Sequence, residues 1–159
     1  LAEEEGSGVY LLGGAPGVAQ KTAEIFQRRF PKLRIFGASD GGVVTTAGEV
    51  NRSVISTIAD CRPTILVVAF GHQKQERFIA NYLPLLPTVR VAIGVGGAFD
   101  YWSGSIPRAP RWMQSLGLEW LFRLTHQPHR LTRILRATII FPAVAARDSI
   151  AQYVSSRHH

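Results

Sequence analysis

Short apolar runs alternate along the chain with stretches in which apolar residues recur every three or four positions. The runs predict strands at residues 8–12, 33–37, 64–70 and 89–95, and the periodic stretches predict helices at 18–30, 48–61 and 73–83. Because the run 64–70 is uninterrupted, we expect that strand to be buried on both faces, and we also expect the strand 89–95 to be buried. Strands that alternate with helices of this length predict an α/β fold with a parallel sheet.

The last third of the chain has a different charge balance. Residues 1–106 contain 10 Lys and Arg against 9 Asp and Glu, whereas residues 107–159 contain 8 Arg against 2 acidic residues. We therefore divide the chain into an α/β domain, 1–106, and a basic amphipathic helical C-terminal appendage, 107–159. Arg130, Arg133 and Arg136 recur there at helical spacing opposite Leu131, Ile134 and Leu135.

A basic amphipathic face suits an anionic partner, such as an anionic membrane or a pyrophosphate-bearing substrate. Nucleic acid is disfavoured, because no zinc-finger spacing, aromatic RNA-binding strand or helix-turn-helix accompanies the charge. A solvated helix face packed on the sheet is the alternative. No apolar run reaches the ~20 residues that span a bilayer, and the acidic start does not resemble a signal peptide.

The 159 residues, of which 46% are hydrophobic, suffice for one core. The single Cys61 cannot form an internal disulfide, and we expect a buried thiol in a reducing, cytoplasmic protein. No Asp-x-Asp motif is present, and the histidines have no companion cysteine or well-spaced carboxylate, so we expect no metal and no other cofactor.

Glycine-bearing segments follow several predicted strands, at the carboxyl edge where open α/β sheets bind ligands. Gly13, Gly14 and Gly17 precede a helix, so that backbone N–H groups and the helix N-terminus can bind a phosphate; a tight turn without a ligand is equally compatible. Asp40 follows the second strand. It either accepts a ligand hydroxyl or caps its own turn.

Two further segments present polar side chains at this edge. Gln75 lies in the sequence GHQKQE, and its amide can donate to a phosphate and accept from a sugar hydroxyl. Gly96 and Gly97 allow a ligand to approach the backbone, and Asp100 follows them. The neighbouring aromatic residues suit packing against a base or a sugar ring; they are Phe99, Tyr101 and Trp102. The alternative for Asp100 is a turn aspartate that bonds its own backbone.

The ordered phrases GGAPGV, FGHQKQE, GVGGAFDYWSG and RAPRWMQSLGLEWLFRL resemble the WecG/TagA/CpsF family of bacterial glycosyltransferases. The family builds cell-surface polysaccharides from nucleotide sugars. The resemblance implies a Rossmann-like parallel sheet flanked by helices. It also implies inverting transfer of a hexosyl group, N-acetylmannosaminyl-like, from a UDP-sugar to a polyprenyl-diphosphate-linked sugar in polysaccharide or teichoic acid synthesis. The protein would then be cytoplasmic and peripheral on the inner face of the plasma membrane.

The resemblance also assigns the binding residues. On the domain they are Gly13, Gly14, Gly17, Gln75, Gly96, Gly97 and Asp100, and in the appendage Arg123, Arg130 and Arg133 would contact diphosphate. The aspartate proposed as general base in the family, with a nearby threonine, belongs to the part before Leu1. Asp40 and Asp100 are weak candidates in its place, and we expect this chain alone to transfer little sugar.

Two alternatives stay open at this point. One is a non-catalytic nucleotide-sugar or lipid-phosphate binding module that kept the fold and lost the base. The other is a Rossmann-like oxidoreductase, which is disfavoured because no G-x-G-x-x-G follows the first strand. The transferred sugar, the acceptor and the oligomeric state, including a homo-oligomer, are not determined by these residues.

Overall fold

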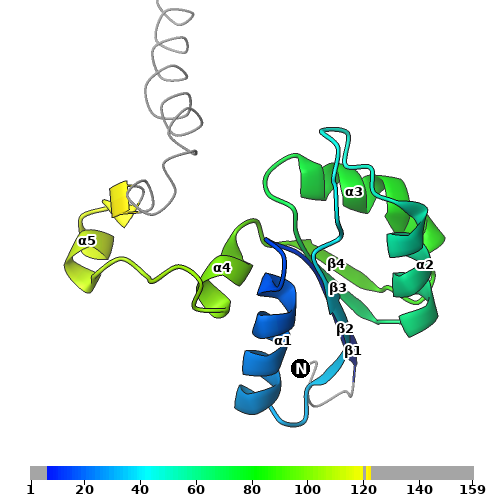
Figure 1. Cartoon of the computed structure of the whole chain (residues 1–159), viewed down its shortest axis with the longest axis horizontal. Helices are drawn as coiled ribbons and strands as arrows, with labels where there is room; N and C mark the ends of the chain where they lie inside the picture. Colours follow the sequence, from blue (N-terminus) through cyan, green and yellow to red (C-terminus); the bar gives the residue numbers. More distant parts are fainter. Residues whose placement is uncertain (1–6, 120, 123–159) are drawn as a thin grey trace, which may run out of the picture. The chain divides into compact units, whose positions relative to one another are not determined.

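The computed structural model describes residues 7–119, 121 and 122. The chain divides into two compact units, residues 1–107 and 108–159. The first unit contains β1 (Gly8–Gly13), α1 (Val18–Arg29), β2 (Arg34–Ser39), α2 (Arg52–Cys61), β3 (Ile65–Ala69), α3 (Lys74–Tyr82), a 3₁₀ turn (Leu83–Leu85), β4 (Val91–Gly94) and α4 (Ala98–Trp102), and the second contains α5 (Arg111–Ser115) (Figure 1).

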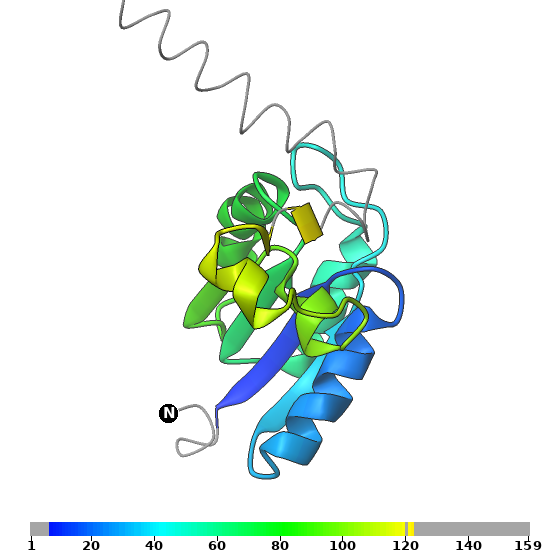
Figure 2. The same ribbon diagram turned by 90° about the vertical axis from the view of Figure 1, so that its left-hand side faces the viewer.

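The four strands form one parallel sheet in the order β2-β1-β3-β4. All six residues of β1 are buried, because this strand lies inside the sheet between β2 and β3. Helices α2 and α3 cover one face, and α1 and α4 lie on the other (Figures 1 and 2). The predicted α/β fold with a parallel sheet flanked by helices is confirmed.

Each face of the sheet has its own apolar cluster. On the α2 and α3 face, the fully buried Phe78 packs edge-on against Phe70 and tilted against Tyr82, with ring centroids 5.1 Å apart in each pair. On the α1 face, Leu11, Ala19 and Phe99 are completely buried. Burying side chains of this size stabilises a fold by about 1.5–3 kcal/mol each, so these clusters hold the helices on the sheet.

The prediction that residues 89–95 form a buried strand is wrong for β4. Val91 is 45% exposed and Ile93 is 48% exposed, although both are apolar. Their partners in register are Ile65 and Val67, and these are only half-buried on the same face, so β3 is not buried on both faces either. The physical reason is that α1 packs on β1 and β2, whereas β4 is the edge strand beyond β3.

Helix α2 begins four residues later than the periodicity predicts. The side chain of Asn51 accepts a hydrogen bond from Ser53 N at 3.0 Å and caps the helix. Gly48, at the predicted start, has φ of +80° and belongs to the preceding loop. Cys61 ends the helix and is half-buried against the core, less buried than expected.

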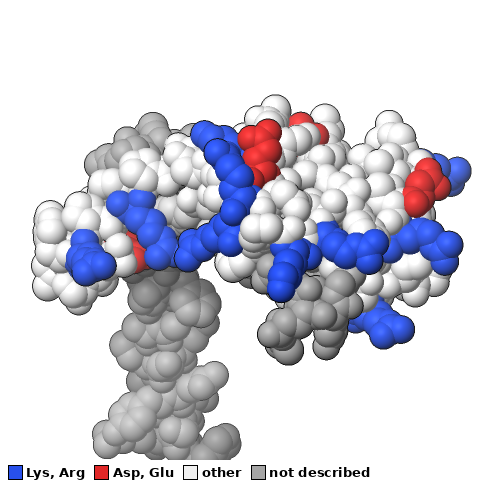
Figure 3. Space-filling view, turned by 90° about the horizontal axis from the view of Figure 1, so that it is seen from below, with Lys and Arg blue, Asp and Glu red and all other residues white. Residues whose placement is uncertain are grey.

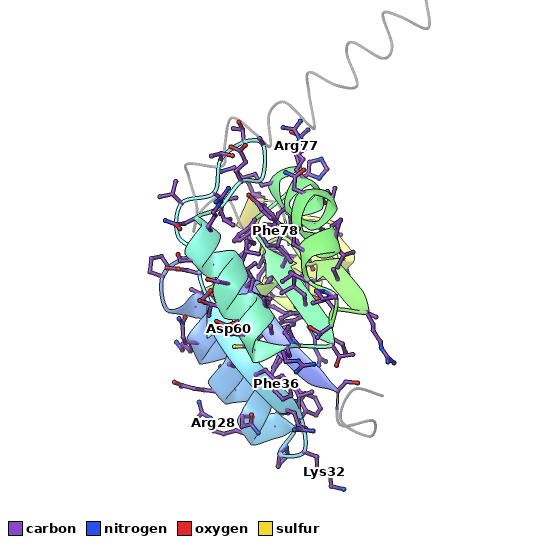
Figure 4. All side chains as sticks on the ribbon, turned by 90° about the vertical axis from the view of Figure 1, so that its right-hand side faces the viewer. Arg28, Lys32, Phe36, Asp60, Arg77 and Phe78 are labelled. Atoms are coloured by element: carbon purple, nitrogen blue, oxygen red, sulfur yellow. The ribbon has the colours of Figure 1, made fainter. Side chains whose placement is uncertain are left out.

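Basic side chains gather at the edge of the sheet where the strands begin (Figure 3). Arg28 and Lys32 lie at this end, while Arg77 lies at the opposite one (Figure 4). The carboxyl ends of the strands, where the glycine-bearing turns lie, are thus at the other edge. Among the helices that the structure describes, none is both long and apolar enough to cross a membrane.

Candidate functional site

The turn between β1 and α1 contains three glycines with positive φ, at +112° for Gly13, +84° for Gly14 and +81° for Gly17. A Cβ on Gly13 would lie 2.7 Å from the carbonyl carbon of Ala69, and Gly14 N donates to the oxygen of that carbonyl at 3.1 Å. Gly13 and Gly14 therefore dock the turn on the end of β3. Gly17 differs, because a Cβ there would meet open space and it precedes α1 without any side-chain cap. The helix N-terminus is open at this point.

Gln75 lies in the first turn of α3 with only 7% of its surface exposed. Its Oε1 accepts from Gly96 N at 2.8 Å, and its Nε2 donates to Glu76 Oε1 at 3.0 Å. A Cβ on Gly94 would lie 2.6 Å from Gln75 Nε2, so a side chain there would have to displace the Gln75 amide. Gln75 therefore ties the start of α3 to the turn after β4. An amide has two donor hydrogens and two lone pairs, and the hydrogen bonds to the described residues use one of each.

The hydrogen bond from the Gln75 amide also affects the pKa of the neighbouring Glu76. The amide hydrogen bond, with smaller contributions from backbone hydrogen bonds and, least of all, from His72, keeps the pKa of the Glu76 carboxyl below its ordinary range. His72 Nδ1 lies 3.9 Å from Glu76 Oε1, and both side chains are well exposed. Because the pKa of Glu76 is lower in the folded protein, the ionised Glu76 carboxylate stabilises the fold above the ordinary carboxyl pKa. This stabilisation is lost as the pH falls through the lowered pKa.

The turn between β4 and α4 brings Gly96, Gly97 and Asp100 to the carboxyl edge. Gly96 has φ of +58°, and a Cβ there would meet open space, as at Gly17. Gly97 precedes the first residue of α4. The carbonyl of Asp100 accepts from Ser103 Oγ at 3.2 Å and from Ile106 N at 3.0 Å, and the residue is 9% exposed.

The expectation that Phe99 faces a ligand is wrong. It is completely buried and belongs to the core under α1. Trp102 packs on Phe26, with ring centroids 5.3 Å apart, and keeps 36% of its surface exposed. The fully buried Thr22 of α1 donates to the carbonyl of Phe99 at 3.4 Å. Aromatic residues in this segment thus fasten α4 to α1.

Asp40 lies in the turn after β2. Its Oδ1 accepts from Gly42 N at 3.0 Å, so that the carboxylate closes its own turn. Of the two interpretations that the sequence left open, the structure shows the turn cap.

The sequence analysis missed a row of side chains on α3. Lys74, Arg77 and Asn81 recur at helical spacing and donate to carbonyl oxygens of the segment before α2. The sequence signal was their i, i+3, i+7 spacing on a helix that opens at the ligand edge. Their acceptors are backbone atoms far away in the chain, which no side-chain motif reveals.

In the second unit, Met113 O accepts from Leu118 N at 2.8 Å and closes the short α5 at Gly117, which has φ of +70°. Arg123, Arg130, Arg133 and Arg136 lie outside the described residues. Within the described part of the chain, no group of three or more His, Cys, Asp or Glu residues could hold a metal ion.

Residues 1–155 match the glycosyl transferase WecG/TagA/CpsF family, and the chain belongs to this family. A relative from Bacillus subtilis strain 168 is 37% identical over 135 residues, which are 85% of this chain and 50% of the relative. A relative from Bacillus spizizenii strain W23 is 39% identical over 134 residues, 84% of this chain and 50% of the relative. Both are named N-acetylglucosaminyldiphosphoundecaprenol N-acetyl-beta-D-mannosaminyltransferase. The chain spans about half the length of these curated relatives.

Replacing Gln75 with leucine should test its internal role. We expect the pKa of Glu76 to rise toward its ordinary range, because the hydrogen bond that lowers it most is lost. The amide of Gly96 should exchange its hydrogen faster, since its acceptor is removed. Carboxyl titration and amide exchange followed by NMR measure both effects. His72→Asn is the control, because it removes only the small imidazole contribution; a Glu76 pKa unchanged by Gln75→Leu would contradict the assignment.

Proposed function

We propose that this chain forms the donor-binding part of a glycosyltransferase. The enzyme moves an N-acetylmannosaminyl-like hexosyl group from a UDP-sugar to a polyprenyl-diphosphate-linked sugar, with inversion at the anomeric carbon, in cell-surface polysaccharide or teichoic acid synthesis. The names of the two Bacillus relatives support the transferred group and the acceptor. The observation that carries the proposal is the presence of two turns with open glycines at the carboxyl edge, at Gly17 and at Gly96, the second of which is held by Gln75.

The proposed site has to stabilise the negative charge that develops on the departing UDP. Oriented N–H groups at a helix N-terminus stabilise such a charge without a metal ion. The N–H groups at the start of α1, where Gly17 precedes the helix, would supply them. Gly96 N already donates to Gln75, so Gly96 and Gly97 would instead let the ligand approach the backbone of their turn closely. In this proposal Gly13 and Gly14 place the first turn, and Asp100 and the remaining donor hydrogen of Gln75 contact the nucleotide sugar. Arg123, Arg130 and Arg133 would contact diphosphate from the appendage.

Neither candidate base is assigned that role. The carboxylate of Asp40 is engaged in its own turn, and Asp100 is buried. A general base has to reach the acceptor hydroxyl within hydrogen-bond distance. We therefore propose a binding role for Asp100 and a turn-forming role for Asp40. The second candidate function is a non-catalytic nucleotide-sugar binding module. It is favoured by the engagement of Asp40 in its own turn and by the burial of Asp100.

Binding of UDP tests the donor site. Isothermal titration of the chain should show saturable binding of UDP and none of NADH. Asp100→Asn, which preserves size and removes the charge, should weaken UDP binding by ~1–3 kcal/mol, the scale for losing a hydrogen bond to a charged group. Asp60→Asn on α2 is the matched control, because Asp60 is an exposed aspartate in the last turn of that helix. Equal affinity of the folded Asp100 variant and the wild type would place the nucleotide elsewhere.

Sugar transfer distinguishes the enzyme from the binding module. A radiolabelled assay with UDP-N-acetylmannosamine and a lipid-diphosphate-N-acetylglucosamine acceptor should give little product with this chain alone, because neither aspartate is placed as a base. Turnover in the range of typical enzymes, about 1–10³ s⁻¹, would show that a residue of this chain acts as the base. Loss of that turnover in Asp100→Asn, with UDP affinity retained, would identify Asp100.

We further propose that the appendage holds the protein on the inner face of the plasma membrane. The proposal is supported by the excess of arginine after residue 107. Co-sedimentation with liposomes should rise with anionic lipid content and fall with salt, as the Debye length shortens from ~10 Å at 0.1 M to ~3 Å at 1 M. Changing Arg130, Arg133 and Arg136 together to glutamate should abolish it and leave UDP affinity nearly intact. Sedimentation that ignores both lipid charge and this triple change would refute membrane docking.

A further inference from the structure

The segment between β2 and α2, residues 40–51, contains neither helix nor strand, yet it begins at the ligand edge of the sheet. Because β2 is parallel to the other strands, the start of this β2–α2 loop and the turns after β1, β3 and β4 share one edge. In Figure 1 the loop rises in cyan beside α3. The elements that fix this loop therefore determine how that edge is shaped.

Helix α3 binds the loop through polar side chains spaced along the helix. Lys74 Nζ donates to the carbonyl of Val44 at 2.9 Å, and Arg77 Nη1 donates to that of Thr46 at 2.8 Å. Asn81 Nδ2 donates to the carbonyl of Ala47 at 3.2 Å. We call Lys74, Arg77 and Asn81 the α3 clamp. Two of its members are cations, and hydrogen bonds from charged donors are the stronger kind.

Backbone packing holds the loop at two places. Gly41 is buried, and a Cβ there would lie 2.7 Å from the ring of Phe70. Gly48 is buried too, and a Cβ there would lie 2.6 Å from the backbone nitrogen of Phe78 in α3. Between these two glycines the loop turns outward, and Val43 is 88% exposed. The α3 clamp acts on this outward part, whose own backbone hydrogen bonds join Thr45 to Gly48 and Glu49.

We propose that the β2–α2 loop forms one wall of the donor site and that Lys74, Arg77 and Asn81 are positioning residues that hold this wall for the nucleotide sugar. The inference rests on the proposed function. It assigns the clamp a role in donor affinity through the loop, without contact between the clamp and the donor. The same helix then sets two walls, since Gln75 from its first turn holds the turn at Gly96.

The test compares the wild-type chain with Lys74→Met/Arg77→Met, which keeps the apolar stems and removes both charged donors. UDP affinity is measured by titration, and amide hydrogen exchange is measured in residues 43–48. We expect exchange in the loop to become faster while β1 and β3 stay protected, and UDP to bind about tenfold more weakly. In the wild type, UDP should slow exchange in the loop. The variant Lys74→Met/Arg77→Lys, which keeps a cationic donor at position 77, should recover most of the UDP affinity that the double methionine variant loses.

Arg28→Met is the matched control. Arg28 is an exposed arginine whose Nε donates to the carbonyl of Glu24, and it lies at the end of the domain opposite to Arg77 (Figure 4). It should change neither loop exchange nor UDP affinity. Asn81→Ala, a milder change, replaces the double variant if that variant does not fold.

Each outcome has a separate meaning. Faster loop exchange with unchanged UDP affinity would overturn the inference and leave the proposed function standing, because the clamp would then only stabilise the fold. Unchanged loop exchange would overturn it as well, because the clamp would not hold the loop. A wild-type chain that binds no UDP would refute the proposed donor site, and the inference with it.

Discussion

The hydrogen bond from Gly96 N to the buried side chain of Gln75 is the contact on which the ligand edge depends. A parallel sheet aligns the ends of its strands but does not fix the turns that follow them. Gln75 belongs to the segment after β3 and reaches across to the segment after β4, the neighbouring strand. Because the amide is buried, leaving its oxygen without a partner costs about 1–3 kcal/mol, which favours the arrangement in which the two turns are linked.

Helix α3 extends the same constraint to the other side of the edge. Its clamp side chains hold the β2–α2 loop, and its backbone approaches Gly48 so closely that no Cβ fits there. The helix starts from Gln73, a residue other than glycine with φ of +68° and ψ of −42°. Such a conformation costs of order 1–3 kcal/mol and persists where the surrounding contacts outweigh it. The contacts of Gln75 and of the α3 clamp lie directly after this residue and offset that cost.

Much of the fold was predictable because it depends on local periodicity. The strands and their parallel arrangement follow from the apolar runs that alternate with helices. The glycine turns follow from positions that require a positive φ. The exposure of Val91 and Ile93 did not follow, because an apolar run is the same in a central strand and in an edge strand. Which strand lies at the edge is decided by the order β2-β1-β3-β4, a property of the whole sheet. The late start of α2 followed from the Asn51 cap, which overrides periodicity at Gly48.

The hydrogen-bond partners of single site residues were harder to predict, because they also depend on the fold as a whole. Residue type showed that Gln75 carries a useful polar group, but not that it would bind Gly96, and it left open whether Asp40 would cap its own turn, as it does at Gly42. The partners are backbone atoms, and their positions are set only when the turns are built. Phe99 illustrates the opposite error, since an aromatic residue beside a glycine pair suggested a ligand contact and the structure places it in the core.

Lys74 and Arg77 are engaged in hydrogen bonds within the protein, and this affects how the proposed enzyme would bind a diphosphate. Both cations lie on the helix that opens at the ligand edge, and both donate to loop carbonyls. Basic side chains also gather at the amino edge of the sheet, which is the edge opposite the turns (Figure 3). On the proposed function, the domain then offers the donor mainly oriented N–H groups, which are dipoles rather than full charges. For this reason the proposed function assigns contacts with the diphosphate to arginines of the appendage, where the excess of arginine after residue 107 lies.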